Sequence, residues 1–225
     1  MSYVSAIVVA AGRGLRLKSK IPKPLVRINK KPLISYSLNA LRACPWIKEI
    51  ILVANRGNRT ILRRSCERVV LGGRQRRDSV KHGLKAISRR ADLVLIHDAA
   101  RPFIDKKIVS KAISAAKRYG AAVVGVPVKS TIKKVVSCQL SVVRVKETIN
   151  RKRLWEIQTP QVFRKDLILK AYRKFASFPA TDDAMLVEKL GKKVYIVPGS
   201  YSNIKITTPE DLLIAGAIAK KWKNA

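Results

Sequence analysis

Short apolar runs alternate with longer amphipathic segments through the first 126 residues. The runs are rich in β-branched residues with few polar interruptions, which is typical of strands buried on both faces. Five such runs lie at 4–11, 47–53, 68–71, 92–97 and 121–126. Between them, helical spacing marks 32–43, 79–90 and 106–119. This alternation predicts an α/β fold with a Rossmann-like, doubly wound, mostly parallel sheet, which binds ligands at the carboxyl ends of its strands.

The alternation breaks at 129–150, where β-branched residues alternate with charged ones and no crossover helix follows. Such a segment predicts a β-hairpin, which is not stable alone and needs a surface to pack on. Two arrangements remain open: a β-meander on the same subunit, or a protruding β-arm exchanged with a second subunit. After it come helical segments at 165–175 and 181–190, a strand at 194–197 and a C-terminal helix capped near Thr208.

The composition favours one domain that spans 1–225, with 47% apolar residues to fill its core. No apolar stretch approaches the ~18–20 residues that span a bilayer, and the N-terminal residues lack a secretory pattern, so we expect a cytoplasmic protein without a membrane partner. The three cysteines, Cys44, Cys66 and Cys138, are widely spaced. With only His82 and His97 as imidazole ligands, we expect neither a disulfide framework nor a zinc site.

The net charge is extreme, because 48 Lys and Arg residues face 14 Asp and Glu residues, giving +34. The excess is spread along the whole chain rather than gathered in a tail, so it predicts a basic surface that attracts phosphates and nucleic acid non-specifically. Self-repulsion should also make stability depend on salt. Since acids are scarce, an acid at a strand end is unusually informative.

A glycine loop follows the first predicted strand, in the sequence AAGRGLR from Ala10 to Arg16. Gly12 and Gly14 allow a sharp turn whose amides can approach an anion. The loop lacks both the third glycine of a dinucleotide fingerprint and the GxxxxGK[ST] pattern of a P-loop. It leads into Lys18, Lys20 and Lys23, and prolines 22 and 24 stiffen the segment that presents Lys23. Cations held against a triphosphate explain this pattern, and a merely basic surface loop is the alternative.

Two further motifs follow predicted strands. In LGGRQRRDSVKHGL, residues 71–84, Ser79 or Asp78 can cap the next helix, or Ser79 and the Gly73 backbone can bind a base; both interpretations stay open. In LVLIHDAARPF, residues 93–103, Asp98 ends a strand and is well placed to hold Mg²⁺ beside a nucleotide. The alternative is an Asp98–Arg101 ion pair that fixes the loop. We expect His97 to be structural.

Nine motifs in order resemble the 2-C-methyl-D-erythritol 4-phosphate cytidylyltransferases of the non-mevalonate route to isoprenoids. They are AAGRGLR, IPKP, GGRQRRDSVKHGL, HDAARPF, PVKSTIK, TINRKRLW, QTPQVF, TDDAMLVEKLG and NIKITTPEDL. The resemblance covers nearly the whole chain and implies a nucleotidyltransferase that moves CMP from CTP to 2-C-methyl-D-erythritol 4-phosphate, with Mg²⁺ as cofactor.

The resemblance also implies roles for individual residues. Arg16 and Lys23 would neutralise the α-phosphate of CTP, and the nucleotide would lie on Ala10, Ala11, Gly12, Gly14, Gly73 and Ser79. Asp98 would serve the metal and, with Arg101, the acceptor. Thr131, Arg151 and Lys205 would bind the phosphate of the acceptor. In the family the 129–150 arm embraces a second subunit, which implies a homodimer in which Thr131 and Arg151 act on the partner's site.

Two positions depart from the family pattern. Asn150 stands where Asp is frequent before Arg151, and Arg74 stands where an acid or a small residue is common. The nearest alternative activity is that of a ribitol-5-phosphate cytidylyltransferase, because acceptor choice depends on a few pocket contacts. A nucleic-acid-binding protein on a transferase fold is more remote, since aromatic residues make up only 6% of the chain.

Overall fold

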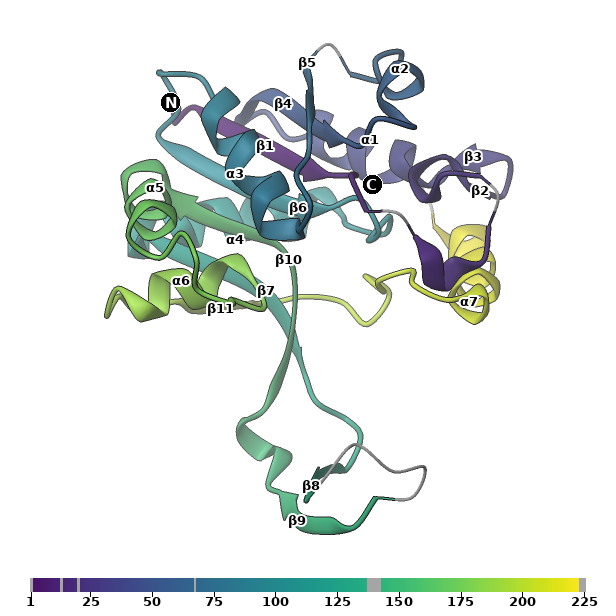
Figure 1. The fold of residues 1–225 in the computed structure, drawn as a ribbon, viewed down its shortest axis with the longest axis vertical. Helices are drawn as coiled ribbons and strands as arrows, with labels where there is room; N and C mark the ends of the chain where they lie inside the picture. Colours follow the sequence, from purple (N-terminus) through teal and green to yellow (C-terminus); the bar gives the residue numbers. More distant parts are fainter. Residues whose placement is uncertain (1, 13, 20, 67, 137–142, 223–225) are drawn as a thin grey trace.

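The computed structural model describes residues 2–12, 14–19, 21–66, 68–136 and 143–222. Its centre is a seven-stranded sheet in the order β11-β7-β10-β6-β1-β4-β5 (Figure 1). The strands are β1 (Val4–Val9), β4 (Ile47–Ala54), β5 (Arg68–Leu71), β6 (Leu93–Asp98), β7 (Ala121–Pro127), β10 (Trp155–Arg164) and β11 (Tyr195–Pro198). All are parallel except β10, which runs antiparallel to both β6 and β7. The prediction of a mostly parallel, doubly wound sheet is confirmed.

Helices cover both faces of the sheet because the apolar residues of the strands point alternately to each side. On β1, Ala6 and Val8 pack with α1 (Leu33–Arg42), α2 (Arg59–Leu62) and α4 (Lys106–Tyr119). Ile7 faces the other side and packs with α3 (Arg76–Ala86), α5 (Lys165–Lys174) and α6 (Asp183–Lys189). A smaller core joins the β2 (Arg27–Ile28) and β3 (Lys31–Pro32) ribbon to α7 (Pro209–Lys221). Among the described residues, no helix is long and apolar enough to cross a membrane.

Strand β10 is the main element that the hydropathy pattern fails to predict. Its sequence is interrupted by Gln158, Thr159 and Gln161, which break the apolar run. All three side chains are buried, and each has a hydrogen-bond partner: the Ser200 carbonyl, the His97 ring and the Asp182 carboxylate respectively. A buried polar residue that is fully bonded costs little, so a hydrophobic pattern does not reveal it.

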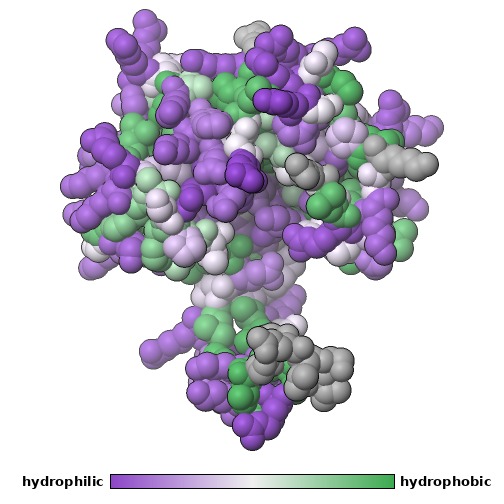
Figure 2. Space-filling view, viewed as in Figure 1, coloured by the Kyte–Doolittle hydropathy of each residue, from purple (hydrophilic) through white to green (hydrophobic). Residues whose placement is uncertain are grey.

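The predicted hairpin forms β8 (Ile132–Val135) and β9 (Val145–Ile149), which pair antiparallel and are followed by a 3-10 turn at Arg151–Arg153. Figure 1 shows this pair at the end of a long extension of β7 and β10, away from the sheet. The space-filling view in Figure 2 shows it as a separate lobe below the body. The hairpin and its protrusion are therefore confirmed. Cys138 lies outside the described residues, and Cys44 and Cys66 are free thiols.

Candidate active site

A cleft of about 1140 Å³ opens at the carboxyl ends of β1, β4, β5 and β6. This is the edge of a parallel sheet where ligands bind. Nine of the predicted site residues line it: Ala10, Ala11, Gly12, Arg16, Lys23, Gly73, Ser79, Asp98 and Lys205. The structure thus brings together segments that lie almost 200 residues apart in the chain.

The glycine loop is shaped by a residue in the left-handed region. Gly14 has φ +67°, and a Cβ atom there would lie 2.9 Å from the Cβ atom of Lys23. The loop therefore packs directly on the stem of Lys23. Two asparagines that sequence reasoning missed support its first residues: Asn58 donates to the Ala10 carbonyl at 3.1 Å, and Asn55 donates to the Ala11 carbonyl at 3.2 Å.

Lys23 carries an ammonium group that the cleft partly desolvates. Burial, reinforced by the neighbouring charge of Lys205, lowers the pKa of Lys23 from 10.5 to about 8. The nearby carboxylate of Asp98 opposes this shift. A partly dehydrated cation beside a glycine loop interacts more strongly with a phosphate than an exposed lysine does.

The double-glycine segment lies in close contact with both the first loop and α3. A Cβ atom at Gly72 would lie 2.6 Å from Ala11 Cβ and 2.6 Å from Ser79 Oγ, and one at Gly73 would lie 2.3 Å from Asp78 Cβ. Ser79 accepts from the Gly73 amide at 3.2 Å and donates to the Gln75 carbonyl at 3.1 Å.

The start of α3 corrects the sequence prediction. The helix begins at Arg76 rather than 79, because Gln75 and Asp78 form a reciprocal capping box. Ser79 is therefore not the cap, although Asp78 takes part in capping. The hydroxyl of Ser79 instead fixes the Gly73 amide at the wall of the cleft.

Asp98 ends β6 and is held by two cations. Arg76 Nε contacts one carboxylate oxygen at 2.9 Å and Lys205 Nζ contacts the other at 2.7 Å. Burial alone would raise the pKa of Asp98, but Arg76 and Lys205 outweigh burial and hold it well below its usual range. The carboxyl group therefore stays ionised.

The alternative Asp98–Arg101 ion pair is wrong. The guanidinium of Arg101 donates to the main-chain carbonyls of Asn203 and Ile157 instead, and it is not among the residues that line the cleft. Only the main chains meet, since the Arg101 amide donates to the Asp98 carbonyl. The two terminal nitrogens of the Arg101 guanidinium thus bond to β10 and to the loop after β11, whereas its Nε has no hydrogen-bond partner among the described residues.

His97 has the structural role that the sequence predicts. Its ring is fully buried, with Nε2 3.0 Å from the Arg101 carbonyl and Nδ1 3.0 Å from Thr159 Oγ1. Burial lowers the pKa of His97 to about 4, so the ring is neutral near pH 7. It joins β6 to β10 beneath the site.

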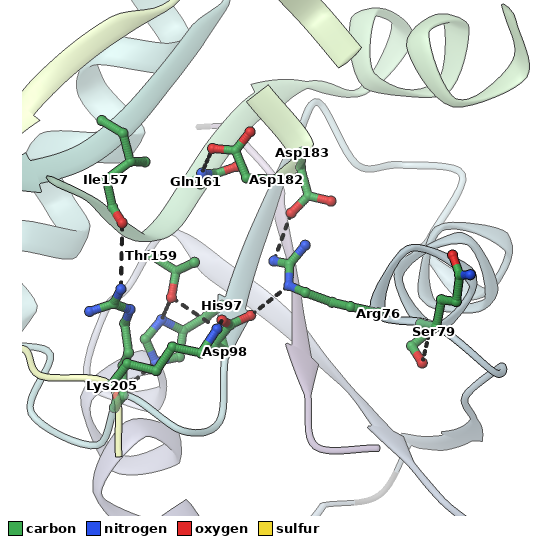
Figure 3. Close-up of polar contacts among 12 residues, drawn as sticks. Arg76, Ser79, His97, Asp98, Ile157, Thr159, Gln161, Asp182, Asp183 and Lys205 are labelled. Atoms are coloured by element: carbon green, nitrogen blue, oxygen red, sulfur yellow. Dashed lines mark hydrogen bonds and ion pairs between the residues drawn. The ribbon is translucent and has the colours of Figure 1, made fainter. Parts of the chain in front are cut away.

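Sequence reasoning did not single out Arg76, which lines the cleft, or its buried partner Asp183. Figure 3 shows Arg76 reaching between the carboxylates of Asp98 and Asp183. Both residues fall inside motifs that carry the family resemblance, GGRQRRDSVKHGL and TDDAMLVEKLG. In a chain with 48 basic residues, an individual arginine gives no signal until a structure shows its partners.

Thr131 and Arg151 do not join the cleft of their own subunit. Both are exposed on the arm, and the guanidinium of Arg151 donates to the Lys129 carbonyl. Asn150 accepts from the Lys152 amide at 3.0 Å and so caps the short 3-10 turn that carries Arg151. Arg74 lines the cleft beside the double glycine.

The donor set fits a magnesium ion that is held mainly by phosphate oxygens. Asp98 is the only carboxylate among the described residues that line the cleft, and the described part of the chain contains no cluster of three or more His, Cys, Asp or Glu residues. Mg²⁺ typically takes one or two protein carboxylates and completes its shell with phosphates and water. The site thus suits an ion that arrives with a nucleotide.

Comparison with known proteins agrees with this geometry. The sequence profile of the 2-C-methyl-D-erythritol 4-phosphate cytidylyltransferase family matches residues 4–221. An enzyme of that description from Syntrophus aciditrophicus is 43% identical over 229 residues, covering 97% of this chain and 96% of the relative. One from Caldanaerobacter subterraneus is also 43% identical, covering 97% of this chain and 99% of the relative.

Solved structures give the same result. The 4-diphosphocytidyl-2C-methyl-D-erythritol synthase of Anaerococcus prevotii superposes with a TM-score of 0.85 at 35% identity, covering 97% of this chain and 96% of the other. The cytidylyltransferase of Thermus thermophilus superposes with a TM-score of 0.79 at 31% identity, covering 98% and 100%. Sequence, fold and cleft therefore lead to one conclusion: the chain belongs to the 2-C-methyl-D-erythritol 4-phosphate cytidylyltransferase family.

Proposed function

We propose that this chain transfers CMP from CTP to 2-C-methyl-D-erythritol 4-phosphate and releases pyrophosphate, forming 4-diphosphocytidyl-2-C-methyl-D-erythritol. The observation that carries the proposal is the cleft itself, in which Arg16, Lys23 and Lys205 stand around a glycine loop at the carboxyl edge of the sheet. Such a site suits two polyanionic substrates that must be brought together.

The reaction is an in-line nucleophilic displacement at the α-phosphorus of CTP. An oxygen of the acceptor's phosphate forms a bond to this phosphorus, while the bond to the oxygen that bridges the α- and β-phosphates breaks. Pyrophosphate leaves with that bond's electron pair. A phosphate monoester is already ionised near neutral pH, so the step needs no general base. Charge repulsion is the main obstacle, and positioned cations relieve it.

The nucleotide is proposed to lie on the two glycine segments. The Gly73 amide and Ser79 hydroxyl are fixed to each other, and Asn55 and Asn58 hold the Ala10 and Ala11 backbone. These internal contacts hold the two glycine segments in place where a base and a ribose would lie. Arg16 and Lys23 then face the α-phosphate, and Lys205 faces the acceptor.

Mg²⁺ belongs to the proposal as a cofactor, with Asp98 as its protein carboxylate. When bound it would neutralise phosphate charge and favour departure of pyrophosphate. The basic residues of the cleft orient the α-phosphate of CTP and the phosphate of the acceptor, and they neutralise part of the negative charge.

A homodimer formed through the arm is also proposed. Ile132, Val136 and Val145 expose apolar side chains on the arm, and a two-stranded hairpin has little stability unless another surface covers it. If that surface belongs to a second copy, Thr131 and Arg151 can complete the partner's acceptor site. A cytoplasmic location fits the free thiols of Cys44 and Cys66, since such thiols persist in a reducing compartment.

Phosphorus NMR of the product tests the proposed reaction. The chain is incubated with CTP, 2-C-methyl-D-erythritol 4-phosphate and Mg²⁺, and a parallel sample contains UTP in place of CTP. We expect the doublets of a diphosphate diester and a matching amount of pyrophosphate, chiefly from CTP. Hydrolysis of CTP without the diester, or no reaction from a folded sample, would contradict the proposal.

A further inference from the structure

A continuous series of polar contacts runs from Asp98 in the cleft into the core behind it. Arg76 uses Nε to contact Asp98 at 2.9 Å and Nη2 to contact Asp183 at 2.8 Å. The second carboxylate oxygen of Asp183 accepts from the Tyr172 hydroxyl at 2.5 Å. Arg76 and Asp183 each use one atom for a contact towards the cleft and another for a contact away from it, and Figure 3 shows Arg76 between the two carboxylates.

The far end of the series is fixed by the fold. The side chain of Asp183 is 1% exposed at the first position of α6. Gln161 of β10 accepts from the Ala184 amide at 3.1 Å and donates to Asp182 at 2.7 Å, so the first turn of α6 is tied to the central sheet. Burial raises the pKa of Tyr172, so its hydroxyl remains a donor across the working pH range.

The two cations on Asp98 differ in how firmly they are held. The side chain of Arg76 is 29% exposed and has Asp183 as a second partner. The side chain of Lys205 is 43% exposed, and the family resemblance gives it the acceptor's phosphate as a ligand. When a phosphate competes for Lys205, Arg76 is the contact that keeps Asp98 in place.

The charge balance of the chain makes this group unusual. The chain has 14 acids against 48 bases, yet two of those acids share Arg76. The pairs Lys134–Glu147 and Arg164–Asp166, by contrast, join exposed partners on the surface, where such pairs contribute little. Buried groups that support a site residue typically set its orientation.

We propose that Tyr172 and Asp183 are positioning residues that act through Arg76 to hold the Asp98 carboxylate at the angle required by the acceptor or its metal. This inference rests on the proposed function of the cleft. It assigns a role in the reaction to two residues of α5 and α6 that do not line the cleft.

A double-mutant cycle tests the inference. Tyr172→Phe keeps the ring in the core and removes only the hydroxyl. In the native background we expect this change to lower kcat/KM for the acceptor by about 10-fold, the lower end for a group that supports a site residue. In an Asp98→Asn background the same change should cost less than about 2-fold, because the carboxylate that Tyr172 serves is already gone.

Tyr36→Phe is the matched control. It also removes one hydroxyl that bonds a single partner, the Ile28 carbonyl at 2.8 Å, but it lies by Phe103 outside the series. Melting temperatures of all variants are recorded, and rates are measured well below them. We expect Tyr36→Phe to leave kcat/KM close to that of the native chain.

The inference would be overturned if Tyr172→Phe lowered kcat/KM by the same factor in the native and Asp98→Asn backgrounds. It would also be overturned if Tyr36→Phe lowered kcat/KM as much as Tyr172→Phe does. If Tyr172→Phe does not fold, Asp183→Asn, which removes the charge that holds Arg76, replaces it in the same cycle, and the same criterion applies. Failure of the proposed function is distinguishable, because the native chain itself would then form no diphosphate diester.

Discussion

At the scale of single residues, Lys23 is the side chain whose environment bears most directly on the proposed chemistry. Its ammonium group is partly desolvated, it packs under Gly14, and it lies close enough to Lys205 for their charges to repel. The family resemblance gives it the α-phosphate as a ligand, and the structure places it in the cleft beside the glycine loop. Two measurements follow from this environment.

Removal of the Lys23 charge should affect turnover more than binding. We expect Lys23→Ala to lower kcat by ~10²–10³, the scale for one lost charge-stabilising donor, with a much smaller change in KM for CTP. Steady-state pyrophosphate release measures both constants. Lys31→Ala, which removes an exposed lysine on β3, is the control. An unchanged kcat in Lys23→Ala would contradict the assigned role.

The lowered pKa of Lys23 predicts an alkaline limit to activity. The protonated form is the active one, so kcat/KM for CTP should fall as pH rises through about 8, where free Lys23 loses its proton. Lys23→Arg keeps a charge that does not titrate, and we expect its profile to stay level to a higher pH. Rates between about pH 6 and pH 10 at low CTP check this. An identical alkaline limb in both proteins would show that another group causes it.

Single-residue predictions from the sequence were most successful where a residue belongs to a local pattern. Nine residues named from the sequence line one cleft: glycines and strand ends pointed to residues such as Gly12, Gly73 and Asp98, whereas Lys205 came only from the family resemblance. Arg76, Asp183 and the Asn55–Asn58 pair were missed, since their importance comes from partners distant in the chain. The Asp98–Arg101 pair was wrong because proximity in sequence does not fix where a guanidinium points.

At the scale of elements, α3 is the connection between core and cleft. Its first turn carries Arg76 and Ser79, and its inner face packs against β1 at Gly83. A Cβ atom at Gly83 would lie 2.6 Å from Ile7 Cγ2, and the Ile7 side chain is fully buried in the core. Neither side can move easily, so a glycine is required for the close approach of helix and sheet.

A matched pair of helical glycines tests this packing. We expect Gly83→Ala to lower the free energy of unfolding by ~1–3 kcal/mol through overpacking. Gly216→Ala, in α7, meets no atom within 4 Å and should raise it by ~0.5–1 kcal/mol through helix propensity. Urea denaturation of both variants gives the two values. If the two substitutions change stability in the same direction, the packing argument is wrong.

The same scale shows why the sequence predicts parallel strands better than β10. The parallel strands between helices are mostly apolar, whereas β10 carries Gln158, Thr159 and Gln161 among its core residues. These three side chains bond to the Ser200 carbonyl, the His97 ring and the Asp182 carboxylate, which are distant in the sequence. The start of α3 differs from the sequence prediction for a related reason. The capping box at Gln75 starts α3 three residues earlier than its apolar spacing indicates.

At the scale of the whole molecule, the arm raises the question of which subunit it serves. It carries Thr131 and Arg151, both exposed and outside the cleft of their own chain. In a two-fold dimer both subunits use the same surface for contact, so each arm would reach the other subunit and complete its site. The sequence alone left a meander and an exchanged arm open, because hairpin patterns do not specify their partner.

Complementation between two inactive variants distinguishes a meander on the same subunit from an arm exchanged between subunits. Arg151→Ala and Lys23→Ala chains should each be nearly inactive as homodimers. After the two are unfolded and refolded together, a mixed dimer would contain one site with both native residues, so we expect about a quarter of native activity. Co-refolded activity no greater than the sum of the separate samples would show that Arg151 serves its own subunit or none.

The choice of acceptor tests the central claim most directly. Pyrophosphate release is measured with CTP and Mg²⁺ at matched concentrations of 2-C-methyl-D-erythritol 4-phosphate and ribitol 5-phosphate. The account predicts strong release with the former and little with the latter. A preference for ribitol 5-phosphate, or no release with either from a folded sample, would contradict it.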